Sequence, residues 1–228
     1  MVLKFRRDTE RQKMATNKTN KSAYTLIGDR ACVDLANTIY PQVRPGGSIA
    51  TWGELVGFLC ACRLVGEEQY QRLVDLEVSV PKAVAAAHRT ALKLRDAVRE
   101  AVVAIAERRP VPGWCVEDVN RVLRFTEGYE QLLPDGEGWR LGYVEVEKRL
   151  EWLLAAIARS AAELIAEGPK APVRKCGRPE CILYFYDTSR TGKRRWCQMA
   201  VCGNRAKVAA FVTRRNRMEH KWEGKKGR

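Results

Sequence analysis

The stretch Cys176-Gly-Arg-Pro-Glu-Cys181 is followed, after a longer connecting segment, by Cys197-Gln-Met-Ala-Val-Cys202. Two short-spaced cysteine pairs joined in this way are what a tetrahedral thiolate site for zinc requires, because each pair turns two sulfur atoms toward one point. We therefore predict that these four cysteines bind one structural Zn²⁺ ion. Four thiolates leave no coordination position for a water molecule, so the pattern disfavours a catalytic zinc.

Two other interpretations of these cysteines are disulfide bonds and buried free thiols. Disulfides are rare in proteins that stay inside the cell, where we expect this chain to reside. Buried thiols rarely fall into two matched pairs within a segment that has so little other core material. A segment of about 45 residues cannot hold itself together by burial alone, whereas structural zinc contributes roughly 10–16 kcal/mol in comparable peptides.

The residues between and after the pairs predict a small ββα unit. Ile182-Leu-Tyr-Phe-Tyr186 is strongly strand-forming, residues 187–193 form a turn, and Arg194-Arg-Trp196 returns as a second strand. Residues 203–215 form a helix, and we expect its apolar side chains, Val208, Phe211 and Val212, to pack inward. The expected result is a compact zinc finger of the treble-clef or zinc-ribbon type.

Upstream of this unit the apolar spacing is mainly helical, and the predicted fold class is therefore mainly α. The expected helices span residues 32–39, 52–62, 67–77, 81–108, 116–125 and 145–167. Ser48 or Thr51 can cap the second of these helices. A turn at Pro134-Asp-Gly-Glu-Gly138 predicts one small β-hairpin, over residues 129–143.

Breaks in composition suggest four parts. Gly168-Pro169 stops the last helix of the upstream part, and Ala171-Pro172 has the composition of a short linker. We predict a disordered basic tail (1–22), a helical domain (23–169), a zinc finger (172–217) and a second basic tail (218–228).

The charge is concentrated in the downstream part. The chain has 228 residues and a formal net charge of +14, of which residues 171–228 carry +12 and residues 1–22 carry +5, while residues 23–170 carry −3. This asymmetry indicates a polyanionic partner, nucleic acid first and an anionic membrane surface second. The alternative for both basic segments is a solvated surface that aids solubility.

No stretch of the sequence predicts a membrane span or a secretion signal. The longest apolar run, Trp152–Ala158, is far shorter than the roughly 20 residues of a membrane helix. The first residues lead directly into polar sequence. We therefore expect no membrane partner and a cytoplasmic location.

Two motifs carry a resemblance to known families. The downstream cysteines, together with Cys202-Gly-Asn-Arg205, resemble the CGNR zinc finger over about residues 172–217. Val33-Asp-Leu-Ala-Asn-Thr38 is similar to a Leu-Asp-Phe-Val-Asn-Thr stretch in the helical ABATE domain that precedes this finger in bacterial proteins, and this looser match covers about 24–168. That family is described as stress-induced transcription regulators. The resemblance implies a helical domain, a four-cysteine zinc site and DNA binding.

Basic residues around the finger are the candidate nucleic-acid contacts, since lysine and arginine bind phosphates and reach base edges. They are Arg190, Lys193, Arg194, Arg195, Arg205, Lys207, Arg214, Arg215 and Arg217. A second interpretation of Arg205 stays open, in which it braces the metal site through carbonyl groups or through Asp187.

In the helical domain, Asp34, Asn37 and Thr38 are polar residues beside an apolar face. We favour a buried hydrogen-bond network or helix cap for them, with a ligand pocket as the alternative. No nucleophile–base pair or carboxylate dyad is identifiable, and His88 and His220 are isolated, so we do not expect an enzyme.

Together these features predict a DNA-binding transcription regulator with a helical sensing or dimerisation domain. Its expected partner is duplex DNA, and a homodimer and a small-molecule effector remain open. Two alternatives use the same surface: an RNA- or ribosome-associated module, and a finger that docks a protein.

Overall fold

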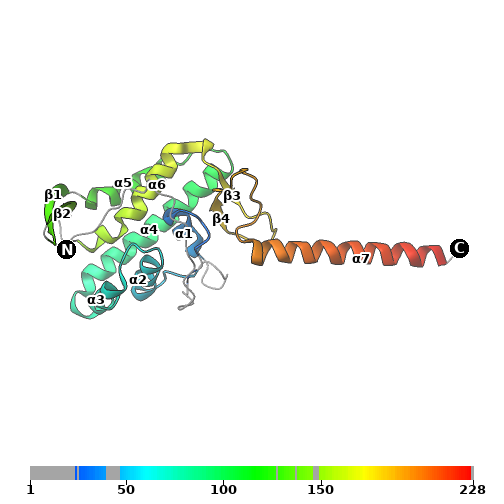
Figure 1. Ribbon diagram of the computed structural model, residues 1–228, viewed down its shortest axis with the longest axis horizontal. Coiled ribbons are helices and arrows are strands. Elements are labelled where there is room, and N and C mark those ends of the chain that lie inside the picture. Colours follow the sequence, from blue (N-terminus) through cyan, green and yellow to red (C-terminus); the bar gives the residue numbers. More distant parts are fainter. Residues whose placement is uncertain are drawn as a thin grey trace.

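The computed structural model describes residues 24, 26–39, 47–126, 128–136, 138–145 and 149–226. The predicted tail at 1–22 and the last two residues lie outside the described part. Figure 1 shows a helical body, a small unit packed on its side, and one long helix, α7, that projects away from both. The described chain is mainly helical, which confirms the predicted fold class.

The helical body surrounds α4 (Pro81–Ala106), which lies against the helices α1, α2, α3, α5 and α6 (Figure 1). The bounds of these helices are α1 Ala31–Ala36, α2 Trp52–Ala61, α3 Glu67–Ser79, α5 Gly113–Leu123 and α6 Ala155–Glu167. The inward face of α4 is the one that its helical spacing predicts, from Val84 through Leu94 to Ile105, and all three side chains are buried.

Local signals account for most of the helix ends. Thr51 caps α2 as predicted: its hydroxyl accepts the N–H of Glu54, whose carboxylate accepts the N–H of Thr51 in return. The first helix, α1, corresponds to the helical face predicted over residues 32–39, the last three of which form a 3-10 turn, Asn37–Ile39. It begins at Ala31 because the carboxylate of Asp34 accepts the N–H groups of Ile27 and Gly28, which holds the preceding residues as a loop.

The predicted hairpin of the body is present. β1 (Gly128–Asp135) pairs antiparallel with β2 (Gly138–Glu145), with Pro134 opposite Trp139. The following helix begins later than predicted. A 3-10 turn over Leu150–Leu154 leads into α6, so the helical spacing upstream of Ala155 belongs to this tighter turn.

The zinc unit, which we define as residues 173–203, has a different hairpin from the predicted one. β3 (Val173–Lys175) pairs antiparallel with β4 (Tyr184–Tyr186), whereas residues 194–196, predicted to pair with β4, form no strand. The reason lies in the core, because Val173 and Tyr184 are both buried in the apolar cluster of the helical body. The presumed linker is packed as well, since Ala171 belongs to the same cluster.

The chain leaves the zinc unit through a π-helical turn, Met199–Gly203, and continues as α7 (Asn204–Lys226). This helix is longer than the predicted 203–215. The prediction that Val208, Phe211 and Val212 pack inward is wrong, since these side chains are 62, 59 and 40% exposed. The apolar interior of the zinc unit is instead filled by Leu183 and Phe185, together with Ile27 from the helical body.

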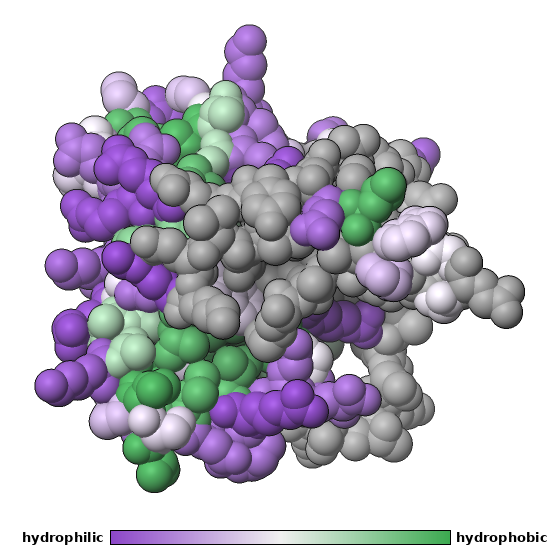
Figure 2. Space-filling model, turned by 90° about the vertical axis from the view of Figure 1, so that its left-hand side faces the viewer, coloured by the Kyte–Doolittle hydropathy of each residue, from purple (hydrophilic) through white to green (hydrophobic). Residues whose placement is uncertain are grey.

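Among the described residues, no helix combines the length and apolar character needed to cross a membrane. The end of the body that lies opposite α7 is largely hydrophilic over its described surface, with smaller apolar areas (Figure 2).

Candidate metal centre and nucleic-acid interface

The four predicted cysteines meet in one buried cluster. The sulfur atoms of Cys176, Cys181, Cys197 and Cys202 all lie within 4.8 Å of one another. The Sγ–Sγ distances are 3.8 Å between Cys181 and Cys197 and 3.6 Å between Cys197 and Cys202. A tetrahedron of sulfur atoms at zinc–sulfur distances of about 2.3 Å has edges of about 3.8 Å. The cluster therefore fits a tetrahedral thiolate-bound ion such as Zn²⁺.

Backbone hydrogen bonds shape the two turns that carry the sulfur atoms. The N–H of Cys176 donates to Leu183 O, and the N–H of Cys181 donates to Arg178 O, both at 2.9 Å. The N–H of Cys197 points at Sγ of Cys176, at 3.5 Å. Such N–H···S contacts favour thiolates, as expected around a structural metal ion.

The electrostatics of the cluster call for a cation. The thiol of Cys197 lowers the pKa of Cys181 by a hydrogen bond, and the same contact raises the pKa of Cys197. Burial raises the pKa of Cys202. Without a metal ion, the cluster therefore stabilises one thiolate and disfavours ionisation of its neighbours. A divalent cation bound among the four sulfur atoms offsets the repulsion between thiolates.

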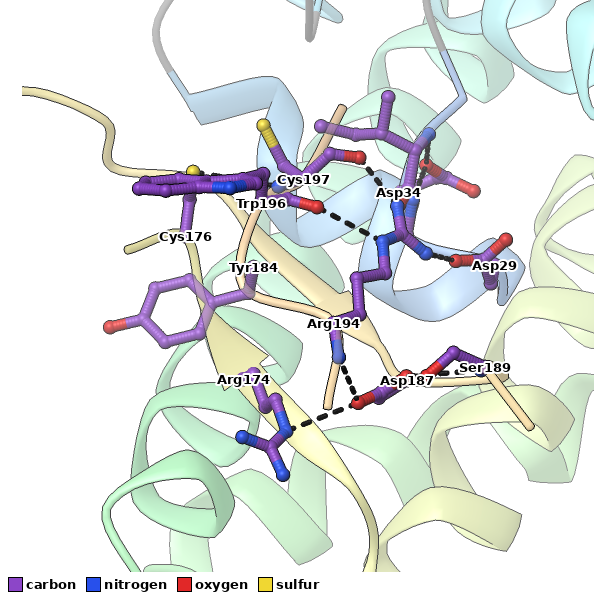
Figure 3. A network of polar contacts seen from close by, with 12 residues as sticks. Asp29, Asp34, Arg174, Cys176, Tyr184, Asp187, Ser189, Arg194, Trp196 and Cys197 are labelled. Atoms are coloured by element: carbon purple, nitrogen blue, oxygen red, sulfur yellow. Dashed lines mark hydrogen bonds and ion pairs between the residues drawn. The ribbon is translucent and has the colours of Figure 1, made fainter. Parts of the chain in front are cut away.

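Arg194 braces the second turn from inside (Figure 3). Its guanidinium donates to Trp196 O and Cys197 O, forms an ion pair with Asp29, and lies over the Phe185 ring at 4.4 Å. From the sequence, this bracing role is one of two interpretations of Arg205, and Arg194 is predicted as a nucleic-acid contact. In the structure Arg205 is exposed, and the bracing contacts are made by Arg194.

Asp187 organises the turn between the cysteine pairs (Figure 3). Its fully buried carboxylate accepts the N–H and the hydroxyl of Ser189 and the N–H of Arg194, and Arg174 forms an ion pair with it at 3.3 Å. Burial raises the pKa of Asp187, but these donors outweigh it, and the pKa lies below its ordinary value. The turn is therefore built around a carboxylate that stays ionised at neutral pH.

The loop before α1 joins the body to the zinc unit. Ile27 lies in the apolar cluster that contains the four cysteines, and its carbonyl accepts from Arg194. Gly28 O accepts the N–H of Tyr186. A side chain at Gly28 would meet the backbone N of Asp34 at 2.7 Å, so this close approach requires glycine. No local sequence pattern marks this loop, because its contacts are with residues far along the chain.

Asn37 makes the second link between the body and the zinc unit. Its side-chain amide donates to Tyr184 O at 2.9 Å and accepts the N–H of Tyr184 at 3.0 Å, and both residues are buried. Arg99 of α4 donates to Ile182 O and lies over the Tyr184 ring. Thr38 donates to Leu35 O within its own turn.

Asp34, Asn37 and Thr38 are all buried, and all three form hydrogen bonds within the chain. Each of the three side chains is engaged with the backbone of the chain. Two of these residues of the helical domain, Asp34 and Asn37, thus also help to position the zinc unit.

Asp34 should make stability depend on pH. Burial raises the pKa of Asp34 to about 7, although the N–H donors of Gly28 and Ile27 lower it. Between about pH 4 and 7 the folded chain then holds a proton that the unfolded chain has released, so this contribution to stability is present at low pH and is lost as the pH rises through 7. Its size is roughly 3–4 kcal/mol at most, at about 1.4 kcal/mol per pKa unit.

Asp34→Asn keeps an oxygen that can accept both N–H groups but does not titrate. We expect the free energy of unfolding of Asp34→Asn to rise relative to that of the natural chain between pH 5 and 8. Urea unfolding of both proteins with saturating zinc measures this difference. Because the two proteins share the same cysteines, the titration of the cysteines cancels in the comparison. Parallel pH profiles of the two proteins would contradict the prediction.

Most of the candidate nucleic-acid contacts lie on the surface of the zinc unit and α7. Exposed are Arg190, Lys193, Arg195, Arg205, Lys207, Arg214 and Arg215. Arg194 is half-buried in the contacts described above, and the side chain of Arg217 lies outside the described part. The structure adds Lys175 and Arg174, which are exposed on β3. Residues 188–215 contain no acidic residue, so every charged side chain of this segment is cationic.

Comparison with protein families confirms both resemblances. The model of the family described as "Putative stress-induced transcription regulator", ABATE, matches residues 29–168. The model of the CGNR zinc finger matches residues 173–215. The first match covers the helical body and the second covers the zinc unit with the first half of α7. A search of curated proteins found no match.

Proposed function

Since the chain belongs to the ABATE family, we propose that it is a DNA-binding transcription regulator whose cationic zinc unit and α7 bind duplex DNA. The observation that carries this proposal is the segment of residues 188–215, whose sequence has seven exposed cations and no acidic residue. Such a surface attracts phosphates and releases their counterions on binding. The proposed protein is a regulator without catalytic residues, and not an enzyme.

The metal in this proposal is a structural Zn²⁺ held by Cys176, Cys181, Cys197 and Cys202. It supplies the energy that keeps the short strands and turns of the zinc unit together. The helical body serves as the sensing or dimerisation part. Because Asn37 and the loop at Ile27 fasten the two parts to each other, a change in the body can reach the DNA-binding surface. We expect the protein to act in the cytoplasm.

Duplex DNA binding should weaken steeply with salt. Lys207 and Arg214 are seven residues apart and therefore share one face of α7. Replacing both by Gln should weaken binding to every duplex sequence and reduce the slope of log K against log salt by about 1 for each lost phosphate contact. Fluorescence anisotropy of a labelled duplex over a salt series measures both quantities.

The matched control is Arg159→Gln, a highly exposed arginine on α6. We expect its salt slope to equal that of the natural chain. Equal slopes for all three proteins would refute the proposed surface. Stronger competition by structured RNA than by duplex DNA would instead favour the RNA-associated alternative.

A further inference from the structure

The projecting helix α7 carries an apolar stripe that nothing in the described structure covers. Val208, Phe211 and Val212 follow one another at helical spacings of three and four, so they lie on one face. All three are exposed, and Figure 1 shows α7 extending away from the body with no other element beside it. Apolar side chains at this spacing normally mark the face of a helix that packs on a partner.

A hollow adjoins the stripe where α7 begins. It measures about 460 Å³ and is lined by Ala200, Val201, Asn204, Arg205, Val208 and Ala209. Val208 is therefore shared by the hollow and the stripe. The two features form one continuous surface, which we name the α7 docking surface: the residues that line the hollow together with Phe211 and Val212.

Charges on the same face indicate the chemistry of the partner. Arg205 precedes Val208 by three residues and Arg215 follows Phe211 by four, so an arginine stands at each end of the stripe. Both arginines are exposed. An occupant that covers the apolar side chains must also face these two cations. An amphipathic helix whose apolar stripe is bordered by Asp or Glu satisfies both requirements.

Other occupants meet this surface less well. A second copy of α7 paired stripe to stripe over residues 204–215 would set cations against cations, because these residues contain no acid. Membrane-surface helices keep their cations on the polar face, whereas Arg205 and Arg215 stand on the apolar face. DNA base edges are polar apart from the thymine methyl group, and so they do not cover a stripe of two valines and a phenylalanine.

We propose that the α7 docking surface binds an acidic amphipathic helix of another protein. The surface adjoins the face of Lys207 and Arg214, and it shares Arg205 and Arg215 with the cations of the proposed DNA-binding surface. Binding of the helix is a function in addition to the proposed DNA binding. A regulator with both faces can hold duplex DNA and a protein partner on the same helix.

The test uses the full zinc-loaded chain and a fluorescent synthetic helix with leucines at heptad positions and flanking glutamates. Phe211→Asn should weaken binding by about tenfold or more, as expected for a central aromatic anchor. Ala210→Asn is the matched control, because Ala210 is exposed on the opposite side of α7, and it should bind like the natural chain. A peptide with lysine in place of glutamate should bind more weakly.

Three results would overturn the proposal. One is equal binding of a scrambled peptide that has the same composition but no apolar face. Another is an unchanged affinity in Phe211→Asn. The third is that Phe211→Asn removes self-association of the chain in sedimentation, or binding to anionic vesicles, while peptide binding stays the same. The salt slope for duplex DNA, measured on the same samples, reports separately on the proposed function.

Discussion

Replacing Cys197 by Ser is expected to abolish stable zinc binding and to unfold the zinc unit. The Sγ atom of Cys197 is one of four that all lie within 4.8 Å of one another, so its loss removes one corner of the tetrahedral site. A structural site contributes roughly 10–16 kcal/mol, and the short strands β3 and β4 cannot replace that energy by burial. We expect zinc affinity to fall by more than about 100-fold. A loss of about 100-fold is the upper limit for residues that only hydrogen-bond to a metal ligand, and Cys197 is itself a ligand.

The effect should extend beyond the zinc unit. Ile27 of the body packs in the same apolar cluster as the cysteines, so the loop before α1 should lose its order as well. Zinc content and the absorption of tetrahedral Co²⁺ measure the loss of metal binding. Limited proteolysis measures the unfolding of the zinc unit and of the loop before α1. Cys60→Ser is the matched control, since Cys60 lies in α2 away from the cluster, and it should keep one zinc ion per chain. A full zinc content in Cys197→Ser would disprove the assignment of the ligands.

The features that the sequence predicted well depend on short-range patterns. The cysteine pairs are local, because residues five apart can face one ion through a single turn. The inward face of α4 follows from helical spacing, and the cap of α2 follows from Thr51 and Glu54. In each case the physical cause lies within a few residues of its effect.

The features that it missed depend on contacts between distant residues. β4 pairs with β3 rather than with residues 194–196 because Val173 finds its place in the core of the helical body, which no local pattern records. Arg194 rather than Arg205 braces the metal site because Asp29 of the body stands within its reach.

The same limit explains the outward-facing stripe of α7. The spacing of Val208, Phe211 and Val212 shows that they share a face, but it is identical for a face that packs inside the chain and one that meets another molecule. Only the three-dimensional arrangement, in which Leu183 and Phe185 already fill the zinc unit, distinguishes the two.

Replacing Asn37 by Ala should weaken both the fold and the metal site, although Asn37 is not a zinc ligand. The change leaves the N–H and the C=O of Tyr184 buried without their partners, at about 1–3 kcal/mol for each group. We expect the free energy of unfolding to fall by about 2–4 kcal/mol. Zinc affinity should fall by roughly 10–100-fold, as for supporting residues of other zinc sites.

The path from Asn37 to the metal is short. Tyr184 directly follows Leu183, whose carbonyl accepts the N–H of Cys176, so release of Tyr184 loosens the first cysteine turn. Thr38→Val is the matched control, because Thr38 is equally buried but bonds within its own turn. It should lower stability by about 1 kcal/mol and leave zinc affinity unchanged. Chelator competition measures the zinc affinity of all three proteins. The prediction fails if Asn37→Ala lowers stability but leaves zinc affinity at the natural value. That result would show that the body and the zinc unit fold without coupling.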